Sequence, residues 1–198
     1  MKRLELKLGP TLLAGGRCRF CVWAPFVESV EVHVLSPQER MEPLRRNRQG
    51  YHCGTLEGIE PGALYLFRLD GSLERPDPAS RFQPQGVHGP SQVVDPAFDW
   101  TQSNWRGILL PHYILYEIHV GAFTAAGTFD AAIERLDDLA ALGITAVELM
   151  PVAQFPGERN WGYDGVYPFA AQNSYGGPQG LKRFVRACHA RGLAVVLD

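Results

Sequence analysis

The chain has 198 residues, of which 45% are hydrophobic and 20% are charged, so it is long and apolar enough for one large or two small globular domains. Its formal net charge of -2 excludes a general electrostatic attraction to nucleic acids or anionic membranes. No window approaches the roughly 18 apolar residues of a membrane-spanning helix, and the N-terminal run MKRLELKLGP is too polar for a secretory signal. We therefore expect a cytoplasmic protein without nucleic-acid or membrane partners.

The cysteines do not have the spacing of a metal site. Cys18 and Cys21 are three residues apart, but they lie in the strand-like run RCRFCVW, where such residues point to opposite faces. No second CxxC or HxxxH pair completes a zinc ligand set, so we expect no metal. We expect reduced structural thiols at all four positions, which are Cys18, Cys21, Cys53 and Cys188.

Residues 1–100 have the pattern of an antiparallel β-sandwich. Short runs of β-strand character alternate with turn signals such as Pro61-Gly62 and Asp70-Gly71. The predicted strands are 17–24, 29–35, 51–57 and 63–70. Regularly spaced short strands without helical periodicity favour a sandwich. Residues 73–111 are rich in proline and contain aromatic anchors, which predicts an ordered connector that ends at residue 111 rather than a flexible linker.

From residue 112 to residue 198 the pattern changes to alternating strands and helices. The predicted strands are 113–120, 144–151 and 193–198, and the predicted helices are 128–143, with Thr128 as its N-cap, and 179–192. This alternation predicts parallel strands covered by helices. A closed (β/α)8 barrel needs about 250 residues and eight strands, so we expect only the start of a barrel, truncated after its third strand, in a piece of a longer protein.

The long loop at 152–177 is the first candidate for function, because active sites of β/α barrels lie at the carboxyl ends of the strands. This loop contains the run NWGYDG at residues 160–165. An aromatic ring can form a floor for the apolar face of a sugar, and an adjacent carboxylate can accept hydrogen bonds from its hydroxyls. The alternative is that Trp161 and Tyr163 only pack the loop onto the rim of the barrel.

Charged and polar residues in the predicted strands are the second group of candidates. Asp198 ends an apolar strand, where barrels carry catalytic groups, although it could instead be a surface residue that caps a following helix. Glu117, His119 and Glu148 interrupt otherwise apolar strands. We interpret these three as structural rather than catalytic, either as a polar network inside the barrel or as solvated groups at its ends, since satisfied buried polar groups are more common than catalytic ones.

Taken together, residues 115–185 resemble glycoside hydrolase family 13, the α-amylase superfamily. ELMPV matches the end of its second barrel strand, and GLAVVLD matches the start of its first conserved region. In the first half, FCVWAP and PDPASRFQPQGVHGPS resemble the N-terminal module of the branching, debranching and trehalose-releasing members. The resemblance implies an immunoglobulin-like (E-set) β-sandwich followed by the first strands of an incomplete (β/α)8 TIM barrel.

Within this superfamily, the run NWGYDGVYPFAAQNSYGGPQG is most similar to the trehalose-releasing members. The resemblance implies that Tyr163 stacks on the sugar at the cleavage site, that Asp198 holds the ionic network around that sugar, and that Trp161 and Asp164 flank the pocket. It implies a glycoside hydrolase that cleaves the α-1,4 bond next to the terminal trehalosyl unit of maltooligosyltrehalose without a cofactor, with maltooligosyltrehalose synthase as its pathway partner. The alternatives are a branching or debranching enzyme, or a non-catalytic α-glucan-binding protein.

The first prediction concerns the activity of the chain by itself. In the superfamily the nucleophilic Asp, the acid/base Glu and the stabilising Asp lie on strands beyond the match to Asp198. Retaining hydrolysis needs two carboxylates about 5 Å apart across the bond. We therefore expect the purified 198-residue chain to be inactive in an α-glucan cleavage assay. Release of any shortened glucan by this chain would contradict the prediction.

Overall fold

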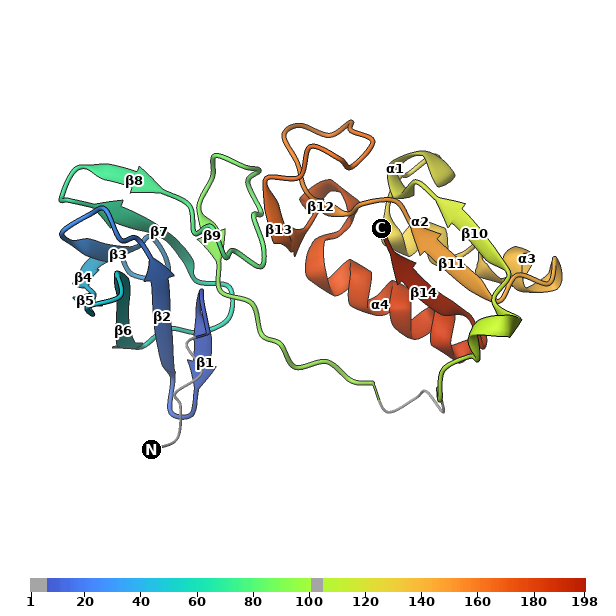
Figure 1. Ribbon diagram of the computed structural model, residues 1–198, viewed down its shortest axis with the longest axis horizontal. Coiled ribbons are helices and arrows are strands. Elements are labelled where there is room, and N and C mark those ends of the chain that lie inside the picture. The colour runs from blue at the N-terminus through green and yellow to red at the C-terminus, as the bar shows by residue number, and fades with distance from the viewer. Residues whose placement is uncertain (1–6, 101–104) are drawn as a thin grey trace. The chain divides into compact units, whose positions relative to one another are not determined.

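The computed structural model describes residues 7–100 and 105–198, which divide into two compact units between Asp95 and Pro96 (Figure 1). The sequence predicted a first domain over 1–100 with a connector to 111, so the division falls somewhat earlier. Part of the run used to judge a secretory signal, residues 1–6, lies outside the described residues. In the described part of the chain, no helix is long and apolar enough to cross a membrane.

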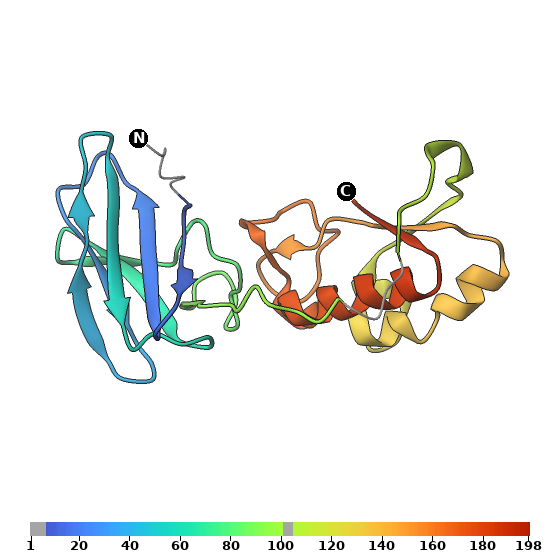
Figure 2. The same cartoon turned by 90° about the horizontal axis from the view of Figure 1, so that it is seen from below.

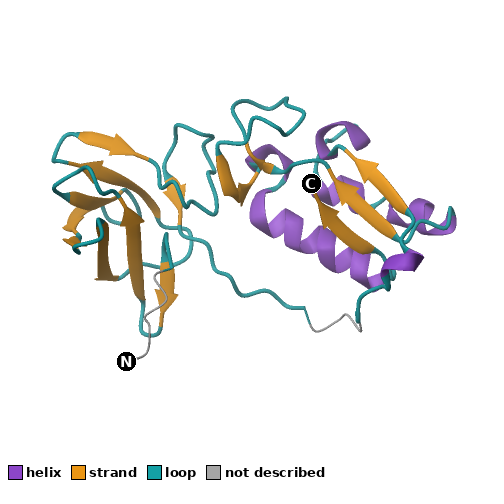
Figure 3. Ribbon diagram, viewed as in Figure 1, coloured by secondary structure: helices purple, strands orange, loops and turns teal. Residues whose placement is uncertain are grey.

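The first unit has two antiparallel sheets that share one hydrophobic core (Figure 3). One sheet has the order β1-β2-β6-β5, with β1 Thr11–Leu13, β2 Arg17–Trp23, β6 Tyr51–Glu57 and β5 Arg45–Arg46. The other has the order β4-β3-β7-β8, with β4 Arg40–Pro43, β3 Val30–Val34, β7 Leu64–Leu69 and β8 Leu73–Arg75, and β9 Ser91–Gln92 also pairs with β7. The predicted sandwich strands are confirmed as β2, β3, β6 and β7.

Alternating side chains of these strands build the core of the first unit. Phe20 on β2, Val32 on β3, and Tyr65 and Phe67 on β7 are at most 1% exposed. Their alternation places every second residue of each strand between the sheets. Burial of each such side chain contributes roughly 1.5–3 kcal/mol, which makes this contact between the sheets the main source of stability of the unit.

The cysteines differ from the sequence prediction. Cys21 and Cys53 lie directly opposite each other on β2 and β6, with Cα atoms 4.2 Å apart, and are joined by a disulfide bond. The expectation of four reduced thiols is therefore wrong for this pair, which only the antiparallel pairing brings together. Cys18 and Cys188 are free and buried, and burial raises their thiol pKa values to about 11 and about 12, so both remain uncharged at neutral pH.

Much of the predicted connector belongs to the first unit instead. Residues 73–95 form β8, β9 and a buried polar cluster of fully buried side chains, which are Asp77, Ser80, Gln83 and Ser91. The Tyr65 hydroxyl donates to Asp77 Oδ2 over 2.7 Å, and the Ser91 hydroxyl donates to Gln83 Oε1 over 2.6 Å. Between β8 and β9, where prolines remove backbone donors, these side chains bond one another and nearby backbone groups in place of a regular ladder.

The second unit contains a parallel sheet of three strands in the order β10-β11-β14, with β10 Leu115–Ile118, β11 Ala146–Leu149 and β14 Ala194–Leu197. Its helices are α1 Val120–Phe123, α2 Phe129–Ile133, α3 Leu136–Ala141 and α4 Gly177–Ala190, and two 3-10 turns cover Leu110–His112 and Asn173–Tyr175. The hairpin β12 Ala153–Gln154 and β13 Tyr167–Ala171 lies outside this sheet. The predicted strand–helix alternation is confirmed.

Two predicted segments are more complex than expected. The helix predicted over 128–143 is capped by Thr128 as expected, whose hydroxyl accepts a hydrogen bond from the Ala131 amide, but it is interrupted between α2 and α3. The apolar residues on both sides of the interruption face the same core, so their periodicity does not reveal it. The loop predicted over 152–177 contains the hairpin and a 3-10 turn, held by the buried amides of Gln154 and Gln172.

The helices pack on one side of the parallel sheet, as Figure 2 shows. Val147 and Leu149 of β11 form a hydrophobic cluster with Phe129 and Leu136 on the helix side and with Phe184 of α4. The strands β10 and β14 border the sheet among the described residues. These borders expose large apolar side chains, which are Leu115, Tyr116 and Leu197.

Pro96, Phe98 and Trp105 contact α4, which agrees with the prediction that aromatic anchors order this stretch. Lys182 donates to the Pro96 carbonyl over 3.0 Å, and the guanidinium of Arg186 lies 5.1 Å from the centre of the Phe98 ring. Trp105 stacks on His189 with ring centres 4.6 Å apart. These ring contacts hold the described aromatic residues of the stretch against the helix.

The buried cluster of the first unit predicts a pH dependence of stability. Burial raises the pKa of Asp77 to about 6, against 3.8 for an exposed Asp, although the Tyr65 hydrogen bond opposes this shift. The folded state therefore binds the proton more tightly than the unfolded state, and stability falls by ~3 kcal/mol as pH rises from about 4 to above 6. We expect Asp77→Asn to remove this fall.

The measurement is urea unfolding of the parent and of Asp77→Asn between pH 4 and pH 7. The control is Glu60→Gln, which removes an exposed carboxyl of the same unit. Stability curves for parent and Asp77→Asn that run parallel over this range would contradict the assignment of the buried proton to Asp77.

Candidate functional site

The candidate site lies where the parallel strands end. The Met150 amide donates to the Ile118 carbonyl and the Asp198 amide donates to the Leu149 carbonyl, both over 3.0 Å. These bonds extend the ladder by one residue past β11 and β14, so the carboxyl ends of the strands meet at the same edge of the sheet. The long loop after β11 starts at this edge, as the sequence predicted.

Tyr163 and Asp198 meet at this edge. The Tyr163 hydroxyl donates to Asp198 Oδ2 over 2.7 Å, although the two residues are 35 positions apart. This hydrogen bond raises the pKa of Tyr163, with further contributions from desolvation and from the negative charges of Asp198, Glu117 and Glu148. The side chain is 62% exposed, so the ring is not packed into the core and one end of it is fixed while its surface remains open.

Asn160 shapes the loop around Tyr163. Its Nδ2 donates to Asp164 Oδ2 over 2.7 Å, and its Oδ1 accepts from the Gly162 amide over 2.8 Å. Gly162 is buried with a φ of +104°, and a Cβ atom placed on it would lie 2.2 Å from the Pro151 carbonyl oxygen. Only glycine fits this close approach, so the loop presses onto the end of β11 immediately before Tyr163.

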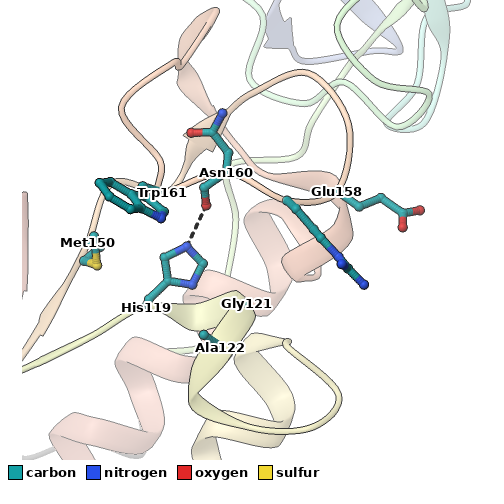
Figure 4. Close-up of a pocket in the computed structure, with 8 residues that line it drawn as sticks. His119, Gly121, Ala122, Met150, Glu158, Asn160 and Trp161 are labelled. Carbon is teal, nitrogen blue, oxygen red and sulfur yellow. Dashed lines mark hydrogen bonds between the residues drawn. The ribbon is translucent and has the colours of Figure 1, made fainter.

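A cavity of about 830 Å³ lies on the β10 side of this loop (Figure 4). It is lined by His119, Gly121, Ala122, Met150 and residues 158–161. The Trp161 side chain is 78% exposed and contributes an aromatic wall, and His119 Nε2 donates to the Asn160 carbonyl over 2.6 Å. Of the four predicted site residues only Trp161 lines this cavity, while Tyr163, Asp164 and Asp198 do not.

Two residues of this region, His119 and Asn160, were not among the predicted site residues. His119 was interpreted as part of the fold, and Asn160 was noted only as a member of NWGYDG. The available signals were the position of His119 at the end of an apolar strand and the ability of asparagine to bond its own neighbours in turns. Neither signal reveals the contact between the two residues, which are 41 positions apart.

The side chains at this edge are of types that can bind a carbohydrate. Exposed aromatic rings can stack on the apolar face of a sugar, and carboxylates can accept hydrogen bonds from its hydroxyls. In the described residues, no group of three or more histidine, cysteine or acidic side chains could hold a metal ion. Of the carboxylates near Tyr163, Asp198 is the one that bonds directly to its hydroxyl.

Comparison with known proteins identifies the class. Residues 92–198 match the catalytic domain of the alpha-amylase family, and residues 7–82 match carbohydrate-binding module 48, the isoamylase N-terminal domain. The chain therefore belongs to the alpha-amylase family of glycoside hydrolases and contains the start of its catalytic domain, which confirms the predicted superfamily.

Individual known proteins resemble the chain over most of its length. Malto-oligosyltrehalose trehalohydrolase from Saccharolobus solfataricus is 45% identical over 90% of this chain, and the enzyme of the same name from Deinococcus radiodurans is 46% identical over 97%. The chain spans 32% of the length of each. The crystal structure of a protein provisionally named alpha amylase from Salmonella typhimurium is 42% identical and superposes with a TM-score of 0.91, over 96% of this chain and 32% of that one.

The close approach of Gly162 to Pro151 predicts the effect of a single methyl group. Gly162→Ala combines a positive φ with a clash against a backbone oxygen, so we expect a loss of about 2–4 kcal/mol in the free energy of unfolding. Gly157→Ala is the matched control. Gly157 lies in the same loop and also has a positive φ, of +73°, but a Cβ atom placed on it would have no atom within 4 Å. Chemical denaturation measures both, and equal losses in the two variants would contradict the role of the clash.

Proposed function

We propose that the protein containing this chain is a trehalose-releasing glycoside hydrolase that cleaves the α-1,4 bond next to the terminal trehalosyl unit of maltooligosyltrehalose. The identity of 45–46% to two malto-oligosyltrehalose trehalohydrolases over at least 90% of the chain supports this reaction. The observation that carries it is the Tyr163–Asp198 hydrogen bond at the carboxyl edge of the parallel sheet, where this class of fold performs its chemistry.

In this proposal Tyr163 stacks on the sugar at the cleavage site and Asp198 holds its polar surroundings. The 62% exposure of Tyr163 supports a stacking role, because the ring surface remains available. Trp161 and Asp164 flank the substrate: Trp161 offers a second open ring, while Asp164 acts indirectly by bonding the Asn160 amide. The chemistry is acid–base and nucleophilic work by carboxylates and needs no cofactor.

The rest of the fold follows from the same proposal. The first unit is an immunoglobulin-like module, and the three parallel strands are the start of a (β/α)8 barrel whose later strands carry the cleaving carboxylates. The exposed apolar side chains at the borders of the sheet support this, since parallel sheets are normally continued and covered. The cytoplasmic location and the pathway partnership with maltooligosyltrehalose synthase stay predictions.

The test expresses the complete reading frame that contains this chain and measures trehalose released from maltooligosyltrehalose. We expect release by the parent, a loss of about 10–100-fold in kcat/KM for Asp198→Asn, and a loss of about tenfold or more for Tyr163→Ala. The control is Tyr51→Phe in the first unit, which should retain activity. Formation of α-1,6 branches without trehalose would favour a branching enzyme, and glucan binding without turnover would favour a non-catalytic protein; either result overturns the proposal.

A further inference from the structure

We propose that His119 is a positioning residue, which holds the loop at residues 160–164 through Asn160 so that Tyr163 faces Asp198. The effect of His119 on sugar binding rests on the proposed function, in which the Tyr163 ring stacks on the sugar. Its geometric content is independent of that function, since it concerns only which contacts fix Tyr163.

The first step is that the imidazole is held by rigid elements. His119 directly follows β10 and is the N-terminal cap of α1, where its carbonyl accepts hydrogen bonds from the Ala122 and Phe123 amides over 2.9 Å. Gly121 leaves room for the ring, because a Cβ atom there would lie 3.1 Å from His119 Cε1 and 2.9 Å from Tyr175. The backbone that carries the imidazole is therefore held at the end of β10.

The second step is the hydrogen bond to the loop. A carbonyl oxygen only accepts, so the distance of 2.6 Å between His119 Nε2 and the Asn160 oxygen means that Nε2 carries a proton and donates it (Figure 4). The buried Nδ1 atom has no hydrogen-bond partner among the described residues. The ring is half-buried and borders the cavity, and its edge packs against Tyr175 with ring centres 6.1 Å apart and Nε2 3.5 Å from the Tyr175 hydroxyl. The shorter bond from Nε2 is the one that reaches the loop.

The third step carries the constraint from Asn160 to Tyr163. The Asn160 side chain binds the Gly162 amide and the Asp164 carboxylate, which are the neighbours of Tyr163 on both sides. Gly162 is seated against the Pro151 carbonyl. The backbone of Tyr163 is thus fixed before and after its Cα atom, and its hydroxyl reaches Asp198 Oδ2. Without the bond from His119, the backbone carbonyl of Asn160 is free to move, and the loop at residues 160–164 can move with it.

The experiment uses the 198-residue chain labelled with 13C at tyrosine Cζ, because the NMR shift of that carbon follows ionisation of the phenol. The chain has seven tyrosines, and Tyr163→Phe assigns the signal of Tyr163. The hydrogen bond to Asp198 is the largest cause of the raised pKa of Tyr163. The charges of Glu117 and Glu148 also raise this pKa, and none of the variants below removes either carboxylate. We expect His119→Ala to lower this pKa, and His119→Gln, which keeps an N–H donor, to restore most of it.

Two further variants separate positioning from a general loss of stability. Leu139→Ala removes a buried core side chain of α3 away from the loop and should lower the melting temperature without changing the Tyr163 pKa. Asn160→Ala keeps the backbone carbonyl that His119 binds but removes the side-chain bonds to Gly162 and Asp164, so it should also lower that pKa. It tests the connection from Asn160 to Tyr163, and His119→Gln tests the first bond if His119→Ala does not fold. An unchanged Tyr163 pKa in His119→Ala or Asn160→Ala, or an equal fall in Leu139→Ala, overturns the inference.

Calorimetric titration with maltoheptaose then tests the consequence for binding. We expect His119→Ala to weaken affinity about fivefold, Tyr163→Ala to weaken it at least as much, and His112→Ala, an exposed histidine before β10, to leave it unchanged. In one outcome, the His119 variants change the Tyr163 pKa while Tyr163→Ala leaves the affinity for maltoheptaose unaltered. That result would support His119 as a positioning residue and contradict the proposed stacking role of Tyr163. If Tyr163→Ala weakens binding but the His119 variants change neither quantity, positioning fails and the proposed function stands.

Discussion

Parallel pairing of β10, β11 and β14 is the constraint on which the candidate site depends. Because the three strands run in the same direction and in register, their carboxyl ends meet at one edge of the sheet. The hydrophobic cluster that Phe129 and Phe184 form with β11 supports this pairing from the helix side. A shift in register would move Asp198 away from the loop and turn alternate side chains to the opposite face.

Both units hold irregular, proline- or glycine-rich segments by the same physical means. In the first unit, Asp77 and Gln83 collect the hydrogen bonds of the segment between β8 and β9. In the second, Gln172 and Asn160 do so for the loop after β11. A single neutral hydrogen bond adds only about 1 kcal/mol, but a buried polar group without a partner costs more, so these networks select one conformation of each segment.

Under the proposed function, the second network preorganises Tyr163 for binding. A ring that stacks on a sugar contributes most when its orientation is fixed before the ligand binds, because less conformational entropy is then lost on binding. Tyr163 is exposed yet bonded to Asp198 at its hydroxyl and held by neighbours on both sides of its backbone. Such a combination is difficult to achieve on a surface loop of this length unless the loop is anchored to the sheet.

The sequence by itself determined the class of each half of the chain and most of its strands, because alternation of side chains and helical periodicity are local properties. The carboxyl-end position of NWGYDG and of Asp198 also followed from it. Only the tertiary structure decided that Cys21 bonds Cys53, that residues 73–95 join the sandwich, and that His119 contacts Asn160. These contacts join residues far apart in the chain or depend on side-chain hydrogen bonds, and neither has a period that a sequence pattern can show.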